Sequence, residues 1–580
     1  MNAPRRLAAL ACAAGVLLSL PLRSQEKPSE PSPVFADQID VRVVNVEVVV
    51  TDRQGNRITG LKPEDFRLLV DRKPVALEYF TEVREGEAVA ASPGAADRQP
   101  SVEAGGPVGT NYLIFVDDLF SIATQRDVVL KGLVRDLSQL GPRDRVAIVA
   151  WDGRRLTRLV DWSSSGNAVA GAIRQAMMRP TRGLRDRIEQ ARLRSDNALM
   201  ASAIQGEFVD QPASDIEQAG PVTAGSSALG LTEIAYGSMV ARDIAGTVSA
   251  VVSAMRASGA PEGRKVMLLL CGGWPFTLEG AIRGDLPRPI TRELPETEPV
   301  LRTLTSTANL LGYTVYPVDV PGLTTVAGDI TTQPGLLNQG GSRSGPGQFD
   351  GLPLPLPATG PSSAREQEVE GSLHFIAKET GGKPMLNGNR ELALARASVD
   401  TRTYYWLGFT PAWRRDGKTH RLEVKVRRPF NARSRTNFAD LSRTAEMGMT
   451  VESALLFGDL PAGEPLTVRL GTPASAREKG LKEIPLTLEI PVSAVTLLPA
   501  DGKYAGRAEL RLAAADERGN ESQIPVIPVE LSSPVAPAEG QTVRYETKIF
   551  LRGQANRVVA VLYDPLSGKL AAGSAEIAKP

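Results

Sequence analysis

The sequence predicts an α/β protein whose main part is a doubly wound domain, a largely parallel sheet with helices on both faces. Between residues 105 and 402, apolar runs such as 112–116, 145–151 and 265–270 alternate with helical segments. Continuous apolar strands separated by helices are typical of parallel sheets buried on both faces. Outside this range, short strand patterns are punctuated by Gly and Pro, which predicts flanking all-β domains.

The first residues are typical of a secretory signal peptide. Two arginines precede the apolar run Leu7–Leu20, and polar residues follow. The run is shorter than the ~20 residues that span a bilayer. Cys12 lies inside it rather than after it, which disfavours a lipid anchor. We therefore expect residues 1–24 to be a signal peptide and residues 25–37 a linker. The mature chain would be periplasmic, attached to the cell envelope or secreted, with no membrane span.

Composition excludes several classes of partner. Lys and Arg number 67 against 66 for Asp and Glu, so no excess of basic charge points to nucleic acid or to an anionic membrane surface. The mature chain would hold one cysteine, Cys271, and could form no internal disulfide. Because free cysteines are commonly buried, we expect Cys271 in the core.

A small β unit is predicted over residues 38–85. It includes the β-branched run 41–50, followed by turn residues around Gly55. So few strands enclose too little core to be stable alone. Residues 403–438 show a second β-rich pattern, and we expect them to complete the unit through a ladder between 41–50 and 420–428. The α/β domain would then be an insertion within this unit.

The α/β domain is predicted to span residues 105–402. Two stretches within it, near 180–228 and 323–366, are polar or rich in Gly, Pro and Ser, and we interpret them as insertions. Strand patterns recur at close spacing after the second β segment, and they predict a C-terminal β-sandwich over residues 444–580.

Several polar residues are expected at one edge of the sheet, which we call the carboxyl rim. Open α/β sheets place ligand sites beyond the carboxyl ends of their strands. Asp117 and Asp118 follow one predicted strand, and Asp152, Gly272 and Asp319 follow three others. We therefore expect these residues to lie on the carboxyl rim together.

Six segments, in order, resemble the acidobacterial-type von Willebrand factor A-related proteins, a family of exported bacterial proteins. The segments are 55–66, 144–151, 263–270, 308–319, 379–382 and 404–411. This resemblance implies a doubly wound von Willebrand A-like (Rossmann-like) domain with flanking all-β (Ig-like) domains.

The resemblance also implies a metal-ion-dependent adhesion site on the rim. In von Willebrand A domains, a D-x-S-x-S loop, a Thr and a later Asp hold Mg²⁺ or Mn²⁺ through oxygen ligands. Asp117 and Ser121 match the loop, and Asp118 would compensate for a missing ligand. The match is incomplete because Leu119 replaces the middle Ser and Gly272 stands where the late Asp belongs.

Further rim residues would complete the set. Ser227 or Thr223 would stand for the Thr, and Asp152 and Asp319 would line the ligand rim. With two ligands lost at once, we expect no cofactor. The preferred interpretation is that Asp117 and Ser121 cap the first helix and hold loop amides. Binding of Mg²⁺ or Mn²⁺ stays the alternative.

No motif in the sequence predicts catalysis. The only histidines are His374 and His420, and neither belongs to a recognisable catalytic motif. We therefore predict an exported protein-interaction or adhesion-type module, not an enzyme, that uses the carboxyl rim to bind a protein partner. The alternative is a structural component of the cell envelope in which the C-terminal sandwich makes the contacts. A hydrolase is the third and weakest hypothesis.

Overall fold

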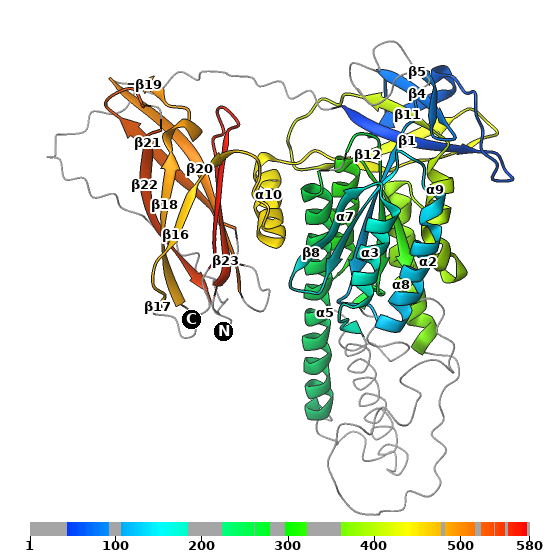
Figure 1. Cartoon of the computed structure of the whole chain (residues 1–580), viewed down its shortest axis with the longest axis horizontal. Coiled ribbons are helices and arrows are strands. Elements are labelled where there is room, and N and C mark those ends of the chain that lie inside the picture. The colour runs from blue at the N-terminus through cyan, green and yellow to red at the C-terminus, as the bar shows by residue number, and fades with distance from the viewer. Residues whose placement is uncertain are drawn as a thin grey trace, which may run out of the picture. The chain divides into compact units, whose positions relative to one another are not determined.

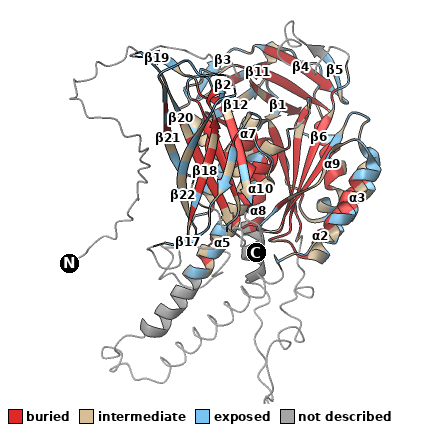
Figure 2. Cartoon of the chain, turned by 60° about the vertical axis from the view of Figure 1, so that its left-hand side comes forward, coloured by how far each residue is buried: buried red, intermediate tan, exposed pale blue. Residues whose placement is uncertain are grey.

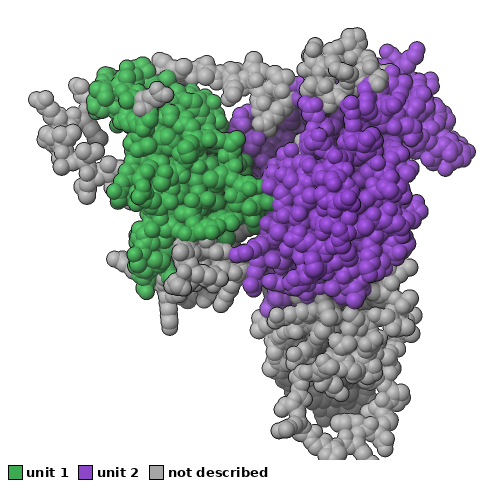
Figure 3. All heavy atoms as spheres, viewed as in Figure 1, with its two compact units in different colours: residues 1–40, 450–580 green, residues 41–449 purple. Residues whose placement is uncertain are grey.

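The computed structural model describes most of the chain after residue 42. The described ranges are 43–91, 106–183, 223–259, 261–278, 296–321, 361–476, 482–500, 502–516, 522, 524–538, 540–551 and 555–576. The expected signal peptide and linker lie outside them. The chain forms two compact units, residues 41–449 and a second that includes residues 450–580, coloured separately in Figure 3. No described helix is long and apolar enough to cross a membrane.

The α/β part of the first unit is built on a five-stranded sheet in the order β10-β9-β6-β7-β8. Its strands are β6 (Thr110–Asp117), β7 (Arg145–Trp151), β8 (Leu156–Ser163), β9 (Arg264–Cys271) and β10 (Tyr313–Asp319). The first four strands of that order are parallel, and β8 pairs antiparallel at the edge. The parallel strands are almost wholly buried (Figure 2), which explains their continuous apolar runs. The predicted mixed α/β class is confirmed.

Helices lie on both faces of this sheet (Figure 1). They are α2 (Ala123–Asp136), α3 (Gly166–Met177), α5 (Thr223–Ala257), α7 (Glu298–Leu311), α8 (Pro361–Thr380) and α9 (Ala393–Thr401). Buried residues of α2, α3 and α9 share one core with Tyr112, Ile114 and Val116 of β6. The helices α5, α7 and α8 pack side by side as a second group. Because side chains alternate along a strand, Leu113 and Phe115 face that group.

Two further sheets form the β unit at the start of the same compact unit. One has the order β13-β1-β11-β4-β5 and the other β14-β12-β2-β3. Their strands are β1 (Val44–Thr51), β2 (Phe66–Val70), β3 (Lys73–Val75), β4 (Tyr79–Arg84), β5 (Glu87–Ala91), β11 (Tyr404–Phe409), β12 (Thr419–Val426), β13 (Asn431–Arg433) and β14 (Asn437–Ala439). Side chains from both sheets, such as Val46, Phe66 and Leu407, form one apolar core between them. Strands from before and after the α/β part therefore fold together.

The ladder expected between residues 41–50 and 420–428 is wrong within the described residues. β1 pairs with β11 and β13, whereas β12 pairs with β2 and β14. The reason lies in burial. β11 is buried at every residue and takes the centre of one sheet, but β12 is half exposed and suits the other sheet, one face of which meets solvent.

A buried polar network joins the β unit to the α/β sheet. The Arg264 Nε–Glu47 Oε2 distance is 3.0 Å, and the Thr314 hydroxyl donates to the same carboxylate at 2.7 Å. The Arg264 guanidinium also lies 4.2 Å from the centre of the Tyr404 ring. Arg264 is 1% exposed, so its charge is balanced inside the protein by Glu47. The two parts are thus fixed to each other by charge as well as by packing.

The second compact unit is a β-sandwich, and the helix that precedes it in the chain has its first residues in the first unit. The helix α10 (Arg443–Phe457) comes first, followed by β15 (Glu464–Pro465), β16 (Thr467–Leu470), β17 (Ala474–Ser475), β18 (Lys482–Pro491), β19 (Leu498–Ala500), β20 (Lys503–Asp516), β21 (Val526–Ser533), β22 (Thr542–Leu551), β23 (Ala555–Tyr563) and β24 (Leu570–Glu576). One sheet contains β15, β24, β23, β20, β19 and β21, and the other contains β16, β18, β17 and β22. Leu486 and Leu488 of β18 share one core with Leu510 and Leu562 of the facing sheet.

Three predicted boundaries need correction. The C-terminal part begins with α10 rather than a strand, because Met447, Val451 and Leu455 give it one buried helical face. The last residues of both predicted insertions are helical, since α5 begins at Thr223 and α8 at Pro361. The remainder of those insertions lies almost entirely outside the described residues.

Candidate functional site

The candidate site is the carboxyl rim of the central sheet. The register pairs Asp117 with Trp151 and Asp319 with Cys271, so the ends of β6, β7, β9 and β10 lie at one edge. Asp152 and Gly272 are the first residues after β7 and β9. The structure therefore brings Asp117, Asp152, Gly272 and Asp319 to one rim, as the parallel pattern predicted.

Asp117 is fully buried, and its carboxylate is occupied by donors of the protein. Its Oδ1 accepts the backbone N–H groups of Leu119 and Phe120, both at 3.1 Å. Its Oδ2 accepts the indole N–H of Trp274 at 2.9 Å. Burial raises the pKa of Asp117 to about 7, although these hydrogen bonds oppose the rise. Asp117 thus holds its own loop together rather than facing an open ligand position.

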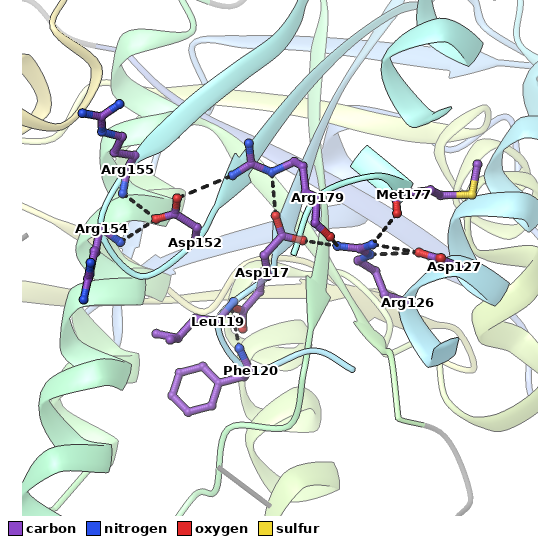
Figure 4. Close-up of polar contacts among 11 residues, drawn as sticks. Asp117, Leu119, Phe120, Arg126, Asp127, Asp152, Arg154, Arg155, Met177 and Arg179 are labelled. Carbon is purple, nitrogen blue, oxygen red and sulfur yellow. Dashed lines mark hydrogen bonds and ion pairs between the residues drawn. The ribbon is translucent and has the colours of Figure 1, made fainter. Parts of the chain in front are cut away.

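Asp118 is neutralised by two arginines, Arg126 and Arg179, both of which are labelled in Figure 4. Arg126 Nη1 lies 2.7 Å from Oδ1, and Arg179 Nε lies 2.7 Å from Oδ2. Burial raises the pKa of Asp118, and the two arginines oppose that rise. The side chains of Asp118 and Arg126 are both 0% exposed, so this is a buried ion pair. Asp118 therefore supports the fold of the rim.

Arg126 connects the rim to α2 and to the end of α3. Its Nε and Nη2 both donate to Asp127 Oδ1 at 3.0 Å. It also donates to the carbonyls of Met177 at 3.0 Å and Arg179 at 3.1 Å. With Asp118, these acceptors satisfy the guanidinium without solvent.

Asp152 fixes the loop that follows β7. Its Oδ1 accepts the backbone N–H groups of Arg154 and Arg155, each at 2.8 Å. Its other oxygen lies 3.9 Å from Arg179 Nη2 (Figure 4). The loop presents Arg154 and Arg155 to solvent, because both are exposed. The acidic residue here is a loop anchor, and the exposed charge at this place is positive.

The two positions that depart from the metal-site pattern of von Willebrand A domains, Leu119 and Gly272, are closely packed. Gly272 lies against the loop backbone, and a Cβ there would overlap the carbonyl of Phe120. Leu119 is 6% exposed, and a Cβ added to Gly153 would lie 2.8 Å from its Cδ1. An Asp at position 272 would have no room unless the loop moved. The two residues that differ from the metal-site pattern, Leu119 and Gly272, therefore both lie in closely packed surroundings.

The remaining candidates differ in what they contact. Ser121 is 1% exposed, and its Oγ has no hydrogen-bond partner within the described residues. Neither Asp117 nor Ser121 caps the first helix, which corrects that expectation: the residue before α2 is Ile122, which has no side-chain cap. Asp117 and Ser121 both precede Ile122 in the loop. The Asp117 carboxylate accepts N–H groups of this loop rather than of the helix.

The structure describes Asp319 and Cys271 but not the side chains of Thr223 and Ser227. Asp319 is 6% exposed, and its backbone N–H donates to Met385 at 3.0 Å. Cys271 is buried as expected, and burial raises the pKa of its thiol. Thr223 and Ser227 fall in the first turns of α5, where side chains lie outside the described residues.

The histidines lie on separate elements. His374 is exposed on α8, whereas His420 lies on β12 and pairs with Asp71. Sequence reasoning missed Arg126, Arg179 and Trp274, which close the rim. Arg126 did carry a signal: Val129, Leu130 and Leu133 follow it at the spacing of one helix face, so an arginine stood on an apolar face.

Comparisons with known proteins leave the family open. No family model matches the chain, and no curated protein matches it. Among solved structures, the TFIIH p34 N-terminal domain aligns at 10% identity and a TM-score of 0.17, over 50% of this chain and 97% of that domain. The pilus adhesin SpaC from Lactobacillus rhamnosus GG aligns at 9% identity and a TM-score of 0.25, over 81% of this chain and 56% of the adhesin. Such low TM-scores carry no argument about function.

Proposed function

We propose that this chain is an exported binding protein whose von Willebrand A-like domain recognises an acidic protein surface through the carboxyl rim, without a bridging metal ion. One observation carries the proposal. The rim carboxylates bind N–H groups of the protein itself. The exposed side chains Arg154, Arg155 and Arg182 are basic. Met178, the first residue after α3, is 79% exposed and would add an apolar contact. Arginines pair well with carboxylates, so they would take over the role of a metal ion.

The order and direction of the strands support the von Willebrand A-like assignment. Four parallel strands and one antiparallel edge strand, with helices on both faces, are the arrangement expected of a doubly wound sheet. The buried Asp117 and Ser121 would then be remnants of an adhesion site whose other ligands became Leu119 and Gly272. We also propose that the chain has no catalytic activity, because its two histidines lie apart on α8 and β12.

The test uses the full chain with a photo-crosslinking amino acid at Met178. We expect one specific protein adduct that persists in EDTA and is lost in the double variant Arg154→Glu/Arg155→Glu. A matched control carries the crosslinker at Glu262, exposed before β9 at the opposite edge of the sheet. An adduct that needs a divalent ion, or that survives charge reversal, would contradict the proposal.

Metal independence has its own measurement. Calorimetric titration of Mg²⁺ and Mn²⁺ into the full chain is expected to give no binding that depends on Asp117. Both oxygens of its carboxylate already accept N–H groups of the protein. Saturable binding that disappears in Asp117→Ala would show a working ion site and would overturn this part of the proposal.

The second candidate function is a structural component of the cell envelope that makes its contacts through the sandwich. It is favoured by a group of exposed large apolar side chains in that unit: Leu460, Leu498, Val526, Val535, Phe550 and Leu566. Val535 is 65% exposed, which makes it a suitable crosslinker position. An adduct from Val535 with none from Met178 would favour this alternative.

A further inference from the structure

A second polar cluster lies in the β unit, away from the rim. Its members Asp416, His420 and Asp440 each offer one metal-ligating atom, and the three atoms lie within 4.8 Å of one another. His420 is on β12, Asp440 directly follows β14, and Asp416 is in the turn that leads into β12. In the described part of the chain, no other group of three His, Cys, Asp or Glu side chains meets this condition.

The ring of His420 is held in place from two directions. Its Nδ1 lies 2.8 Å from Asp71 Oδ2, and the ring stacks on Phe438 with centroids 5.3 Å apart. Asp71 follows β2, the neighbour of β12 on the side away from β14. A carboxylate at Nδ1 fixes the tautomer that leaves Nε2 as an acceptor, which is how metal-binding histidines are commonly oriented. The Nε2 atom lies 3.9 Å from Asp416 Oδ1.

Asp440 supplies a buried carboxylate with one oxygen to spare. The residue is 2% exposed, and its Oδ2 accepts the backbone N–H groups of Arg414 at 2.7 Å and Arg415 at 2.9 Å. Among the described residues, no hydrogen-bond donor reaches its Oδ1. The two backbone N–H groups hold this carboxylate in one orientation beside a fixed imidazole, which leaves its other oxygen as an acceptor for an ion.

We propose that Asp416, His420 and Asp440 form a binding site for a divalent transition-metal ion of the Zn²⁺ type. One imidazole nitrogen and two carboxylate oxygens suit Zn²⁺ better than Mg²⁺ or Ca²⁺, which prefer all-oxygen sites. Ligands at about 2.0–2.2 Å from Zn²⁺ in a tetrahedron stand roughly 3.3–3.6 Å apart. The 3.9 Å pair reaches that spacing by a small rotation of the Asp416 side chain, which is 24% exposed.

The ammonium group of Lys418 does not fill the proposed metal position. Lys418 Nζ lies 3.6 Å from Asp416 Oδ2, but its side chain is 75% exposed and free to turn into solvent. With three protein ligands, the fourth position of the ion would hold water or a group from a bound molecule. The ion would tie the 414–420 turn to the end of β14 and stabilise the second sheet of the β unit.

The experiment is calorimetric titration of Zn²⁺ into the full chain, purified without a histidine tag and stripped with EDTA. We expect one equivalent to bind. The affinity should fall at least tenfold in Asp416→Asn and His420→Gln, and about 10–100-fold in Asp71→Asn, which removes only the support of the ring. The controls His374→Gln and Asp161→Asn, both at exposed positions outside the cluster, should bind as the wild type does.

Co²⁺ provides a second readout, since a tetrahedral site gives a visible absorption band that the same variants should lose. Urea midpoints of the zinc-free variants show whether each is folded. Asp416→Asn keeps the side-chain oxygen that accepts the backbone N–H of Lys418 at 2.9 Å. This variant is therefore expected to fold even if the other variants do not. Absence of stoichiometric binding, or binding retained by folded Asp416→Asn, would overturn the site.

Discussion

The buried pair Asp118–Arg126 gives the strongest test of how the rim is held. Arg126→Leu removes a guanidinium that is 0% exposed and leaves Asp118, equally buried, facing Arg179 alone. Removing one partner of a buried ion pair typically costs about 3–5 kcal/mol, because the remaining charge stays without full compensation. We expect a loss of this size in the free energy of unfolding of the first compact unit.

Tryptophan fluorescence isolates that unit. All five tryptophans of the chain lie within residues 41–449, at Trp151, Trp162, Trp274, Trp406 and Trp413. A urea titration followed by this signal therefore reports the first unit and not the sandwich. With a denaturant slope of roughly 3 kcal/mol per molar urea, the midpoint should fall by about 1 M or more.

The double variant Asp118→Leu/Arg126→Leu tests the reason for the loss. Replacing a buried ion pair by apolar residues is often close to neutral, and Arg179, with an 18% exposed side chain, can turn toward water and Asp152. The double variant should therefore be more stable than Arg126→Leu alone. A single-variant loss below about 1 kcal/mol, or a double variant that loses the sum of both singles, would refute the reasoning.

Three further predictions concern packing and pH. Gly272→Ala should lower the urea midpoint strongly because its Cβ overlaps the Phe120 carbonyl, whereas Gly246→Ala, with open space in α5, should raise stability by about 0.5–1 kcal/mol. The pKa of Asp117, about 7 in the folded chain against 3.8 unfolded, makes its contribution fully present below pH 4 and lost as the pH rises through 7. Wild type should therefore weaken relative to Asp117→Asn between about pH 4 and pH 7, by at most roughly 4 kcal/mol, and a stability difference that does not change with pH would count against this reasoning. Burial tends to raise the pKa of Asp400, but Arg433, Lys383 and Arg57 lower it below its ordinary value. Its contribution to stability is therefore present above pH 4 and lost as the pH falls. The free energy of unfolding of Asp400→Asn should depend less on pH in acid than that of the wild type.

The class of the fold and the location of the rim could be predicted because both depend on local patterns. A strand buried on both faces must be apolar throughout, and runs such as 112–116 and 265–270 show this directly. The carboxyl ends of parallel strands meet at one edge, so Asp117, Asp152 and Asp319 could be assigned to it without coordinates.

The partners of each strand and each charge could not be predicted in the same way. The sequence pattern of a half-exposed strand such as β12 is compatible with pairing to either β1 or β2. Only the packing of β11 beside β1, at the centre of the first sheet, decides that β12 pairs with β2. The neutralisation of Asp118 depends on Arg179, which is 61 residues away in the chain.

What the sequence by itself determined was the α/β class, the edge where polar residues gather and the two departures, Leu119 and Gly272, from a metal-binding pattern. The tertiary structure alone decided that this rim is closed, since the closeness of Gly272 to Phe120 and the bond from Trp274 to Asp117 join separate loops. It also brought Asp71, His420 and Asp440 together from three neighbouring strands. The physical reason is the same in both cases: the composition of a strand follows from its burial, but contacts between distant residues follow from how the strands pack.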